Sequence, residues 1–144
     1  MSKKATADTR FSKFGTISFT ATTRINDFVD YLEKGKVVGT KCKKCGQRYF
    51  PPRADCFHDL TSDMEWFEVT PGGKLLTFST LKFAPAGFDK ELPYTIAVLD
   101  FGDYKVFGRV DSAIPEDKLS VGMPMKVAVN KLPNDHINYY FTAA

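Results

Sequence analysis

The chain has 144 residues, of which 43% are hydrophobic, and its formal net charge of +3 is too small to indicate nucleic-acid binding by composition alone. It contains no stretch of about 18 apolar residues, which excludes a membrane-spanning helix. Residues 1–6 lack an apolar run, so we expect no secretory signal. Together with the cysteine pattern described below, this predicts a cytoplasmic protein.

A short helix is predicted near the N-terminus. Apolar residues between positions 25 and 32 recur at a spacing of three to four, the period of one helix face. Thr23 or Asn26 is expected to cap its start and Gly35 to end it. Residues 1–15 are polar and rich in Ser, Thr and Lys, so we expect them to be loose or to lie on a partner.

All three cysteines of the chain fall in one short window, as Cys42-Lys-Lys-Cys45 and then Cys56. Paired CxxC turns hold Zn²⁺ tetrahedrally in zinc ribbons, and here Asp59 stands where a fourth cysteine is expected. No open coordination position is evident, which favours a structural ion. The predicted zinc ligands are Cys42, Cys45, Cys56 and Asp59. His58 is the alternative fourth ligand, and three buried thiols without metal are the other interpretation.

A basic patch surrounds these cysteines. Seven Lys and Arg residues and no acidic residue lie between positions 34 and 53. Such a patch can meet phosphates, an acidic partner surface or only solvent, and the sequence leaves these three alternatives open.

From residue 64 onward the pattern becomes that of β-strands separated by turns. The expected strands are residues 64–69, 75–83, 94–101, 105–110, 123–132 and 137–142. The expected turns contain Pro71-Gly72-Gly73, Gly102-Asp103, Val121-Gly122 and Pro133-Asn134-Asp135. A loop interrupted by Pro and Gly occupies residues 84–93.

Five or six hairpin-connected strands in about 80 residues are typical of a small OB-fold barrel, although a β-sandwich fragment would give a similar pattern. We therefore predict a mainly β protein in three parts. These are an N-terminal tail and helix (residues 1–36), a zinc ribbon (37–62) and an OB-fold domain (63–144) with a five- to six-stranded barrel.

This order of helix, ribbon and barrel resembles the DUF35 family of acyl-CoA-associated OB-fold proteins. The resemblance rests on an ordered series of short motifs: Cys42-Lys-Lys-Cys45-Gly46, Phe50-Pro-Pro-Arg53, Trp66, Gly72-Gly73, residues 75–80, Leu92-Pro-Tyr-Thr-Ile-Ala-Val98, Phe107-Gly-Arg109-Val110, Val121-Gly-Met-Pro-Met125 and Tyr140-Phe141. The chain departs from the family pattern at Asp59, in the second CxxC motif.

The resemblance implies a non-catalytic accessory subunit of an acyl-CoA-processing complex. The expected partner is a thiolase-like catalytic subunit in a hetero-oligomer, expected to be a heterotetramer, with a hydratase or synthase as the alternative. Each CxxC turn of a zinc ribbon is called a knuckle, and here the second knuckle has Asp59 in place of its last cysteine. In this respect the chain is similar to the small subunit of degradative thiolases, for example one cleaving benzoylsuccinyl-CoA in anaerobic aromatic breakdown. The resemblance further implies contacts to CoA, acyl-CoA or the partner at Arg53 and Arg109, whose guanidinium groups suit forked bonds to phosphate or carboxylate.

No catalytic residue is predicted in the chain itself. Thiolysis needs a reactive cysteine beside a histidine base, yet all three cysteines are expected to bind zinc. The two histidines, His58 and His136, lie in the ribbon and in a polar turn.

Single-stranded nucleic-acid binding is the alternative class, because a ribbon and an OB barrel can stack bases on aromatic side chains. The candidate aromatic residues are Phe78, Phe83, Phe88, Tyr104 and Phe107. Positive charge is concentrated on the ribbon and not along the barrel strands, which argues against this alternative.

Overall fold

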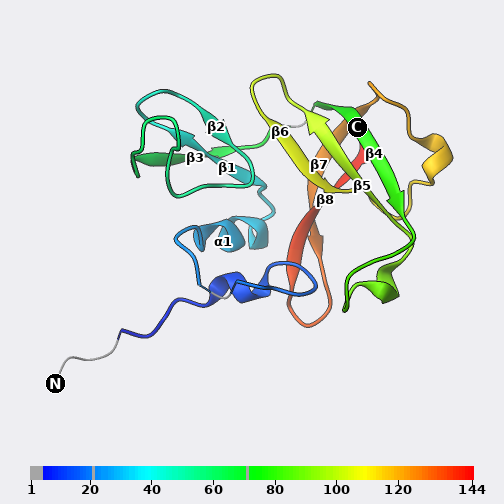
Figure 1. The fold of residues 1–144 in the computed structure, drawn as a ribbon, viewed down its shortest axis with the longest axis horizontal. Coiled ribbons are helices and arrows are strands. Elements are labelled where there is room, and N and C mark those ends of the chain that lie inside the picture. The colour runs from blue at the N-terminus through cyan, green and yellow to red at the C-terminus, as the bar shows by residue number, and fades with distance from the viewer. Residues whose placement is uncertain (1–4, 21, 71) are drawn as a thin grey trace.

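The computed structural model describes residues 5–20, 22–70 and 72–144 and contains two antiparallel β-sheets beside one α-helix (Figure 1). The strands are β1 (Val38–Cys42), β2 (Arg48–Tyr49), β3 (Met64–Glu68), β4 (Gly73–Leu81), β5 (Tyr94–Asp100), β6 (Lys105–Arg109), β7 (Pro124–Lys131) and β8 (Ile137–Ala143). The helical elements are η1 (Arg10–Lys13), α1 (Asp27–Glu33), η2 (Asp89–Glu91) and η3 (Glu116–Lys118). This architecture confirms the predicted mainly β fold. The expectations for residues 1–4 and for Pro71 lie outside the described residues.

The first sheet has the strand order β2-β1-β3 and forms the ribbon. Its central strand β1 carries Gly39, where a Cβ atom would lie only 2.5 Å from the backbone oxygen of Tyr49 and 2.8 Å from the Phe67 ring. The strand predicted over residues 64–69 is present, but it pairs with β1 and not with the barrel. Alternation of side chains identifies a strand and does not identify its partner, because pairing is set by contacts distant in sequence.

The second sheet has the order β6-β5-β4-β7-β8, so the barrel has five strands, the lower of the two predicted numbers. A parallel bridge between Val110 and Phe141 joins the two ends of this order, and the Asp111 backbone N–H donates to the Phe141 carbonyl at 2.8 Å. This is the closure expected of an OB-type barrel. Each strand contributes one side chain that is no more than 1% exposed: Leu75, Leu99, Val106, Met125 and Phe141.

Helix α1 lies against this core through Phe28, Val29 and Leu32, all buried. The amide group of Asn26 donates to the Thr23 carbonyl at 2.6 Å and makes no capping bond to the helix. Gly35, with φ of +80°, follows the helix end, as predicted. Within the described ranges, no helix is long and apolar enough to cross a membrane.

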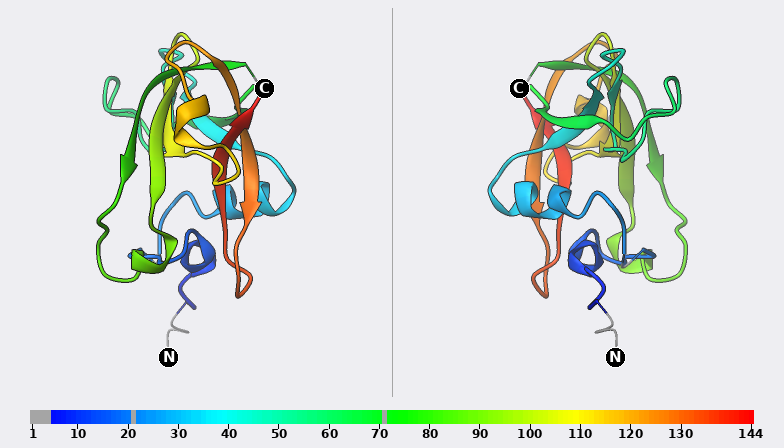
Figure 2. Two further views of the ribbon diagram at one scale, coloured as in Figure 1. Left: turned by 90° about the vertical axis from the view of Figure 1, so that its right-hand side faces the viewer. Right: turned by 90° about the vertical axis from the view of Figure 1, so that its left-hand side faces the viewer.

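The N-terminal segment, residues 10–19, packs under the barrel (Figure 2). Phe14 lies 5.5 Å from the ring of Phe28, and the Gly15 backbone N–H donates to the Ile137 carbonyl at 2.9 Å. The expectation that residues 1–15 are loose is therefore wrong for residues 10–15. This polar stretch is anchored to the core by two aromatic residues, Phe11 and Phe14, which pack against it. The average composition of the stretch does not reveal such an anchor.

Tyr139 joins the three parts of the molecule. Its ring contacts those of Phe14 from the N-terminal segment, Phe28 from α1 and Phe50 from the ribbon, with centroid separations of 6.3, 6.5 and 5.0 Å. Its hydroxyl donates to the Phe107 carbonyl at 2.6 Å, on β6. The ribbon, the helix and the barrel thus share one core.

Candidate metal centre and predicted arginine contacts

The first cysteine pair lies in the turn that connects β1 to β2. The Cys42 backbone N–H donates to the Gln47 carbonyl at 2.9 Å, and the Gly46 N–H donates to the Cys42 carbonyl at 2.9 Å. Gly46 has φ of +77°, a conformation that glycine adopts without steric cost. The turn brings the Cys42 and Cys45 side chains to the same side.

The second knuckle repeats this geometry. The Asp59 backbone N–H donates to the Cys56 sulfur at 3.4 Å, and the next residue, Leu60, has a positive φ of +54°. In the first knuckle the positive φ follows Cys45. The two knuckles therefore correspond, with Asp59 at the position of Cys45.

The structure brings four sequence-predicted residues together, and their ligand atoms lie within 4.8 Å of one another. These residues are Cys42, Cys45, Cys56 and Asp59. The Cys45 and Cys56 sulfurs are 3.8 Å apart, and the Cys42 sulfur lies 3.4 Å from Asp59 Oδ2. Tetrahedral coordination with Zn–S bonds of about 2.3 Å requires sulfur separations of about 3.8 Å. The donor set and spacing fit a zinc ion.

His58 lies outside this group. Its side chain is 70% exposed, whereas that of Asp59 is only 15% exposed, and the His58 Nδ1 lies 3.6 Å from Asp59 Oδ1. Of the two candidate fourth ligands, the structure directs only Asp59 toward the sulfurs.

Hydrogen bonds shift the pKa values of Cys45 and Cys56 in opposite directions. Asp59 accepts from Cys45, which raises the pKa of that thiol to about 12 and lowers the pKa of the Asp59 carboxyl. Burial acts to raise the pKa of Cys56, but bonds from the Tyr49 hydroxyl and from backbone N–H groups outweigh it and lower its pKa to about 7. The buried Cys56 is thus more readily deprotonated for metal binding than Cys45.

Tyr49 is a site residue that sequence reasoning missed. Its hydroxyl lies 3.2 Å from the Cys56 sulfur, and the residue is only 8% exposed. The bond to Cys56 is the main cause of its raised pKa. The only sequence signal was its place on the strand directly after the first knuckle. A partner of this kind orients a thiolate ligand.

Arg53 lies beside a groove of about 240 Å³, which we call the ribbon groove. Thr40 is buried and fixes the Arg53 backbone, accepting from its N–H at 2.7 Å and donating to its carbonyl at 2.8 Å. Arg24 and Trp66 also line the groove. Neither guanidinium forms an ion pair in the part of the chain that the structure describes.

Arg109 lies elsewhere, on β6, and its guanidinium is already paired. Its Nη1 donates to Glu91 at 2.7 Å, and the group lies 3.9 Å from the centroid of the Tyr94 ring. Glu91 in turn accepts from the Thr16 hydroxyl at 2.6 Å. The structure therefore does not bring the two predicted arginine contacts together.

Among the residues that the structure describes, no cysteine has a histidine base beside it. All three thiols belong to the metal cluster, and His136 Nδ1 lies 2.6 Å from the Gly15 carbonyl in the N-terminal segment. His58 lies nearer the cluster, but its side chain is largely exposed and points to solvent.

Comparisons with known proteins agree with this architecture. Residues 30–65 match a family model described as the rubredoxin-like zinc ribbon domain of ChsH2, and residues 66–130 match that of the ChsH2 C-terminal OB-fold domain. The zinc-ribbon match and the cysteine cluster together support a structural zinc ion. Among solved structures, an Ltp2-ChsH2(DUF35) aldolase matches with a TM-score of 0.70 and 21% identity over 85% of this chain and 96% of that chain. A DUF35 protein of unknown function from Sulfolobus solfataricus matches with a TM-score of 0.54 and 21% identity, over 76% of this chain and 81% of that chain.

Two curated archaeal relatives are both described as DUF35 domain-containing scaffold proteins. The one from Methanocaldococcus jannaschii is 30% identical over 105 residues, which covers 72% of this chain and 74% of the relative. The one from Pyrococcus furiosus is 24% identical over 102 residues, covering 71% and 74%. With the ribbon and the barrel in the same order, the chain belongs to the DUF35 family.

Proposed function

We propose that this chain is a non-catalytic accessory subunit that binds a thiolase-like catalytic partner and assists its use of acyl-CoA. One observation carries the proposal: every thiol of the chain belongs to the metal cluster, and no histidine base faces one. Thiolysis by a cysteine nucleophile needs such a base, so these thiols have no means of acyl transfer by themselves. Relatives described as scaffold proteins support the same role.

The zinc ligands in this proposal are Cys42, Cys45, Cys56 and Asp59, and the ion is structural. Four protein ligands complete a tetrahedral site, which leaves no position for substrate. The ion would hold the ribbon in shape so that the basic patch and the ribbon groove are presented to a partner and its ligand.

The ribbon groove is the proposed contact for the phosphate groups of acyl-CoA. Arg24, Arg53 and Trp66 line it, together with Asp55 and Glu65. Arginine forms forked bonds to phosphate, and an indole ring can stack on an adenine. Arg109, the other predicted contact, would first have to release Glu91, so we expect it to contribute less than Arg53 to acyl-CoA binding.

Co-purification of the tagged chain from its own cells, followed by mass identification, tests the proposal. A thiolase-like protein is the expected partner, in the degradative case one acting on a substrate such as benzoylsuccinyl-CoA. An aldolase is the second candidate, because a solved relative is named as a complex of Ltp2 with ChsH2 that is an aldolase. Thioester cleavage by the isolated chain, lost in a Cys45→Ser variant that retains zinc, would overturn the accessory role.

The phosphate contact is tested on the reconstituted complex. Arg53→Ala is expected to raise the KM for acyl-CoA about tenfold with kcat little changed, since one charge-assisted bond is worth about 1.5 kcal/mol. Lys118→Ala is the matched control, because it removes a positive charge from an exposed site outside both the groove and the basic patch. Equal KM values for both variants would place the phosphate contact elsewhere.

Single-stranded nucleic-acid binding receives less support. Tyr104 is 8% exposed and stacks on Phe101, and Phe78 packs against the core, so neither presents a face to a base. Phe83 and Phe107 are exposed, but the basic patch lies on the ribbon.

A further inference from the structure

Strands β4 and β7 begin as neighbours and then diverge. They pair only at Gly73 with Met125 and at Lys74 with Pro124. Beyond this point β4 remains paired with β5, and β7 with β8. Figure 2 shows the two pairs separating toward the N-terminal segment. Among the described residues, 76–81 pair with no strand except β5 and 126–131 with no strand except β8, and we call the opening between these two segments the β4–β7 seam.

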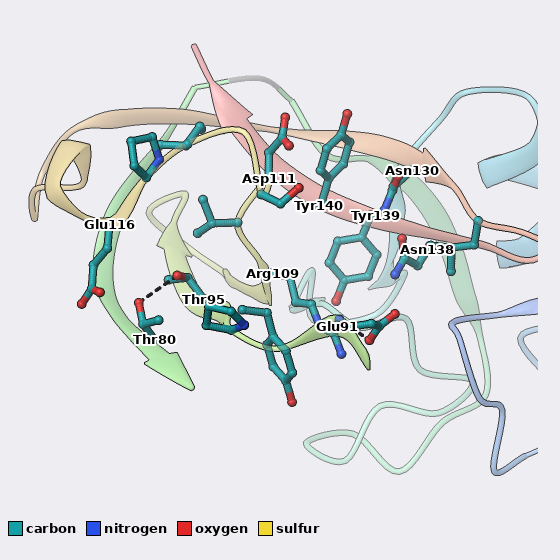
Figure 3. A pocket seen from close by; sticks show the side chains of 17 residues that line it. Thr80, Glu91, Thr95, Arg109, Asp111, Glu116, Asn130, Asn138, Tyr139 and Tyr140 are labelled. Atoms are coloured by element: carbon teal, nitrogen blue, oxygen red, sulfur yellow. Dashed lines mark hydrogen bonds and ion pairs between the residues drawn. The ribbon is translucent and has the colours of Figure 1, made fainter. Parts of the chain in front are cut away.

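A cavity of about 540 Å³ lies at this open end of the barrel (Figure 3). Hydroxyl and carboxamide side chains from both strand pairs line it: Thr80, Thr95, Asn130, Asn138 and Tyr140. The Asn138 carboxamide oxygen is buried and has no hydrogen-bond partner in the described part of the chain. A buried polar atom left unpaired is costly, so an occupant that supplies a donor there would be stabilised.

The cavity has unbalanced negative charge. Its one arginine, Arg109, is neutralised by Glu91 at 2.7 Å. Asp111 and Glu116 also line it, and neither carboxylate forms an ion pair with any residue that the structure describes. Asp111 accepts only the Ala113 backbone N–H, at 3.0 Å. Such a cavity disfavours a phosphate and suits a cationic occupant rich in hydrogen-bond donors.

We infer that the β4–β7 seam receives an extended basic segment of a partner polypeptide. The segment's backbone would pair with a free strand edge, and its Lys or Arg side chain would reach Asp111 and Glu116. Strand addition to an exposed sheet edge is a common mode of peptide recognition, with side-chain pockets supplying selectivity. The inference rests on the proposed function only in assuming that the chain works with a protein partner. The two sites differ in their basic residues: the ribbon groove is lined by two arginines beside Asp55 and Glu65, and the seam cavity by one arginine that is already paired.

The test uses the full-length, zinc-loaded, ¹⁵N-labelled chain and a blocked peptide in which arginine alternates with valine. Its neutral counterpart carries citrulline in place of arginine, and adenosine 3′,5′-bisphosphate serves as the anionic probe. The arginine peptide is expected to shift the NMR signals of residues 76–81 and 126–131 and of the Asn138 side-chain amide. The citrulline peptide should bind about fivefold to tenfold more weakly, as expected for two partly exposed ion pairs.

The double variant Asp111→Asn, Glu116→Gln should weaken arginine-peptide binding by a similar factor. Glu68→Gln, which removes an exposed carboxylate from β3 outside the cavity, should leave it unchanged. The inference is overturned by equal affinity for the two peptides, by shifts caused at the seam by the bisphosphate, or by no shift at millimolar arginine peptide. Because no partner protein is present, this result is independent of the co-purification experiment.

Discussion

The zinc knuckles and the OB barrel bury very different side chains. Every barrel strand contributes a large apolar residue to a core that also includes helix α1. Around the metal cluster, the buried side chains that group together in the described ranges are Cys42, Tyr49 and Cys56, with Met64 packed against them. The barrel is therefore stabilised by apolar burial, while the knuckles lack a core of their own and depend on what the sulfurs bind.

Zinc removal should separate the two regions most clearly. Structural zinc contributes about 10–16 kcal/mol in isolated zinc-finger peptides, so a chelator is expected to unfold residues 39–61. Hydrogen exchange followed by mass spectrometry would show loss of protection there, with protection retained in β5. Equal protection of the ribbon with and without metal would contradict this dependence.

A substitution in the barrel core should destabilise the barrel and leave zinc binding intact. Phe141→Ala is expected to lower the free energy of unfolding by about 3–5 kcal/mol, because Phe141 is fully buried and truncation leaves a cavity. Denaturant unfolding of the zinc-loaded chain measures this loss, and zinc content should stay unchanged in the folded protein. Phe83→Ala is the control, since Phe83 is 90% exposed and its truncation should cost less than about 0.5 kcal/mol. Similar costs for the two variants would show that the barrel core is not the main source of stability.

Replacing the predicted fourth zinc ligand, Asp59, should have the next largest effect, on zinc affinity. Asp59→Ala is expected to lower zinc affinity by at least about tenfold, since loss of an outer-shell partner alone costs about 10–100-fold. His58→Ala should have little effect, because that side chain points to solvent. Competition with a chromophoric chelator measures both affinities, and the reverse order would make His58 the ligand.

A smaller effect concerns the contact between Glu91, Arg109 and Thr16. Burial acts to raise the pKa of Glu91, but the bonds from Thr16 and Arg109 outweigh it and lower the pKa. A carboxyl whose pKa is lowered by folding adds stability above its unfolded pKa, and this stability is lost as pH falls through the folded pKa. At pH 7, Glu91→Gln should therefore cost about 1 kcal/mol, since the pair is partly exposed.

Thermal unfolding of Glu91→Gln and the unmodified chain should converge as the pH falls toward about 3, below the ordinary glutamate pKa. Glu68→Gln is the control, because Glu68 is exposed and forms no ion pair in the described part of the chain. A difference in Tm that stays constant between pH 7 and pH 3 would exclude ionisation as its cause.

The smallest effect is a gain. Leu60 is 87% exposed and has φ of +54°, a conformation that costs a residue with a Cβ about 1 kcal/mol. Leu60→Gly is expected to stabilise the folded ribbon by up to about 1 kcal/mol, less the greater flexibility of glycine in the unfolded chain. Zinc affinity and Tm should both rise slightly. A fall in zinc affinity or in Tm would show that the Leu60 side chain itself stabilises the zinc-bound ribbon.

The sequence was sufficient where the signal is local. The CxxC spacing located the metal cluster, and strict alternation at Met123, Met125, Val127 and Val129 located β7. Asp59 was identifiable because it occupies the place of a missing cysteine. In each case the residues that define the feature lie within one turn or one strand.

Prediction failed where partners are distant in sequence. The pairing of β3 with β1, the attachment of Phe11 and Phe14 to the barrel, and the neutralisation of Arg109 by Glu91 all join separate elements. Side-chain type alone does not specify such contacts. The opening between β4 and β7 was missed for the same reason, since both strands have regular patterns over their whole lengths.

The bond between Gly15 and the Ile137 carbonyl has a consequence for the order of folding during synthesis. Ribosomes deliver the chain from its N-terminus, so the knuckles and β3 emerge well before β8 is made. The ribbon turns can therefore form early, whereas Phe14 and Phe28 gain their neighbour Tyr139 only after β8 has been made. Until then these two rings lack the cover that Tyr139 supplies, which makes the segment from Phe14 to Phe28 a candidate for chaperone binding in the nascent chain.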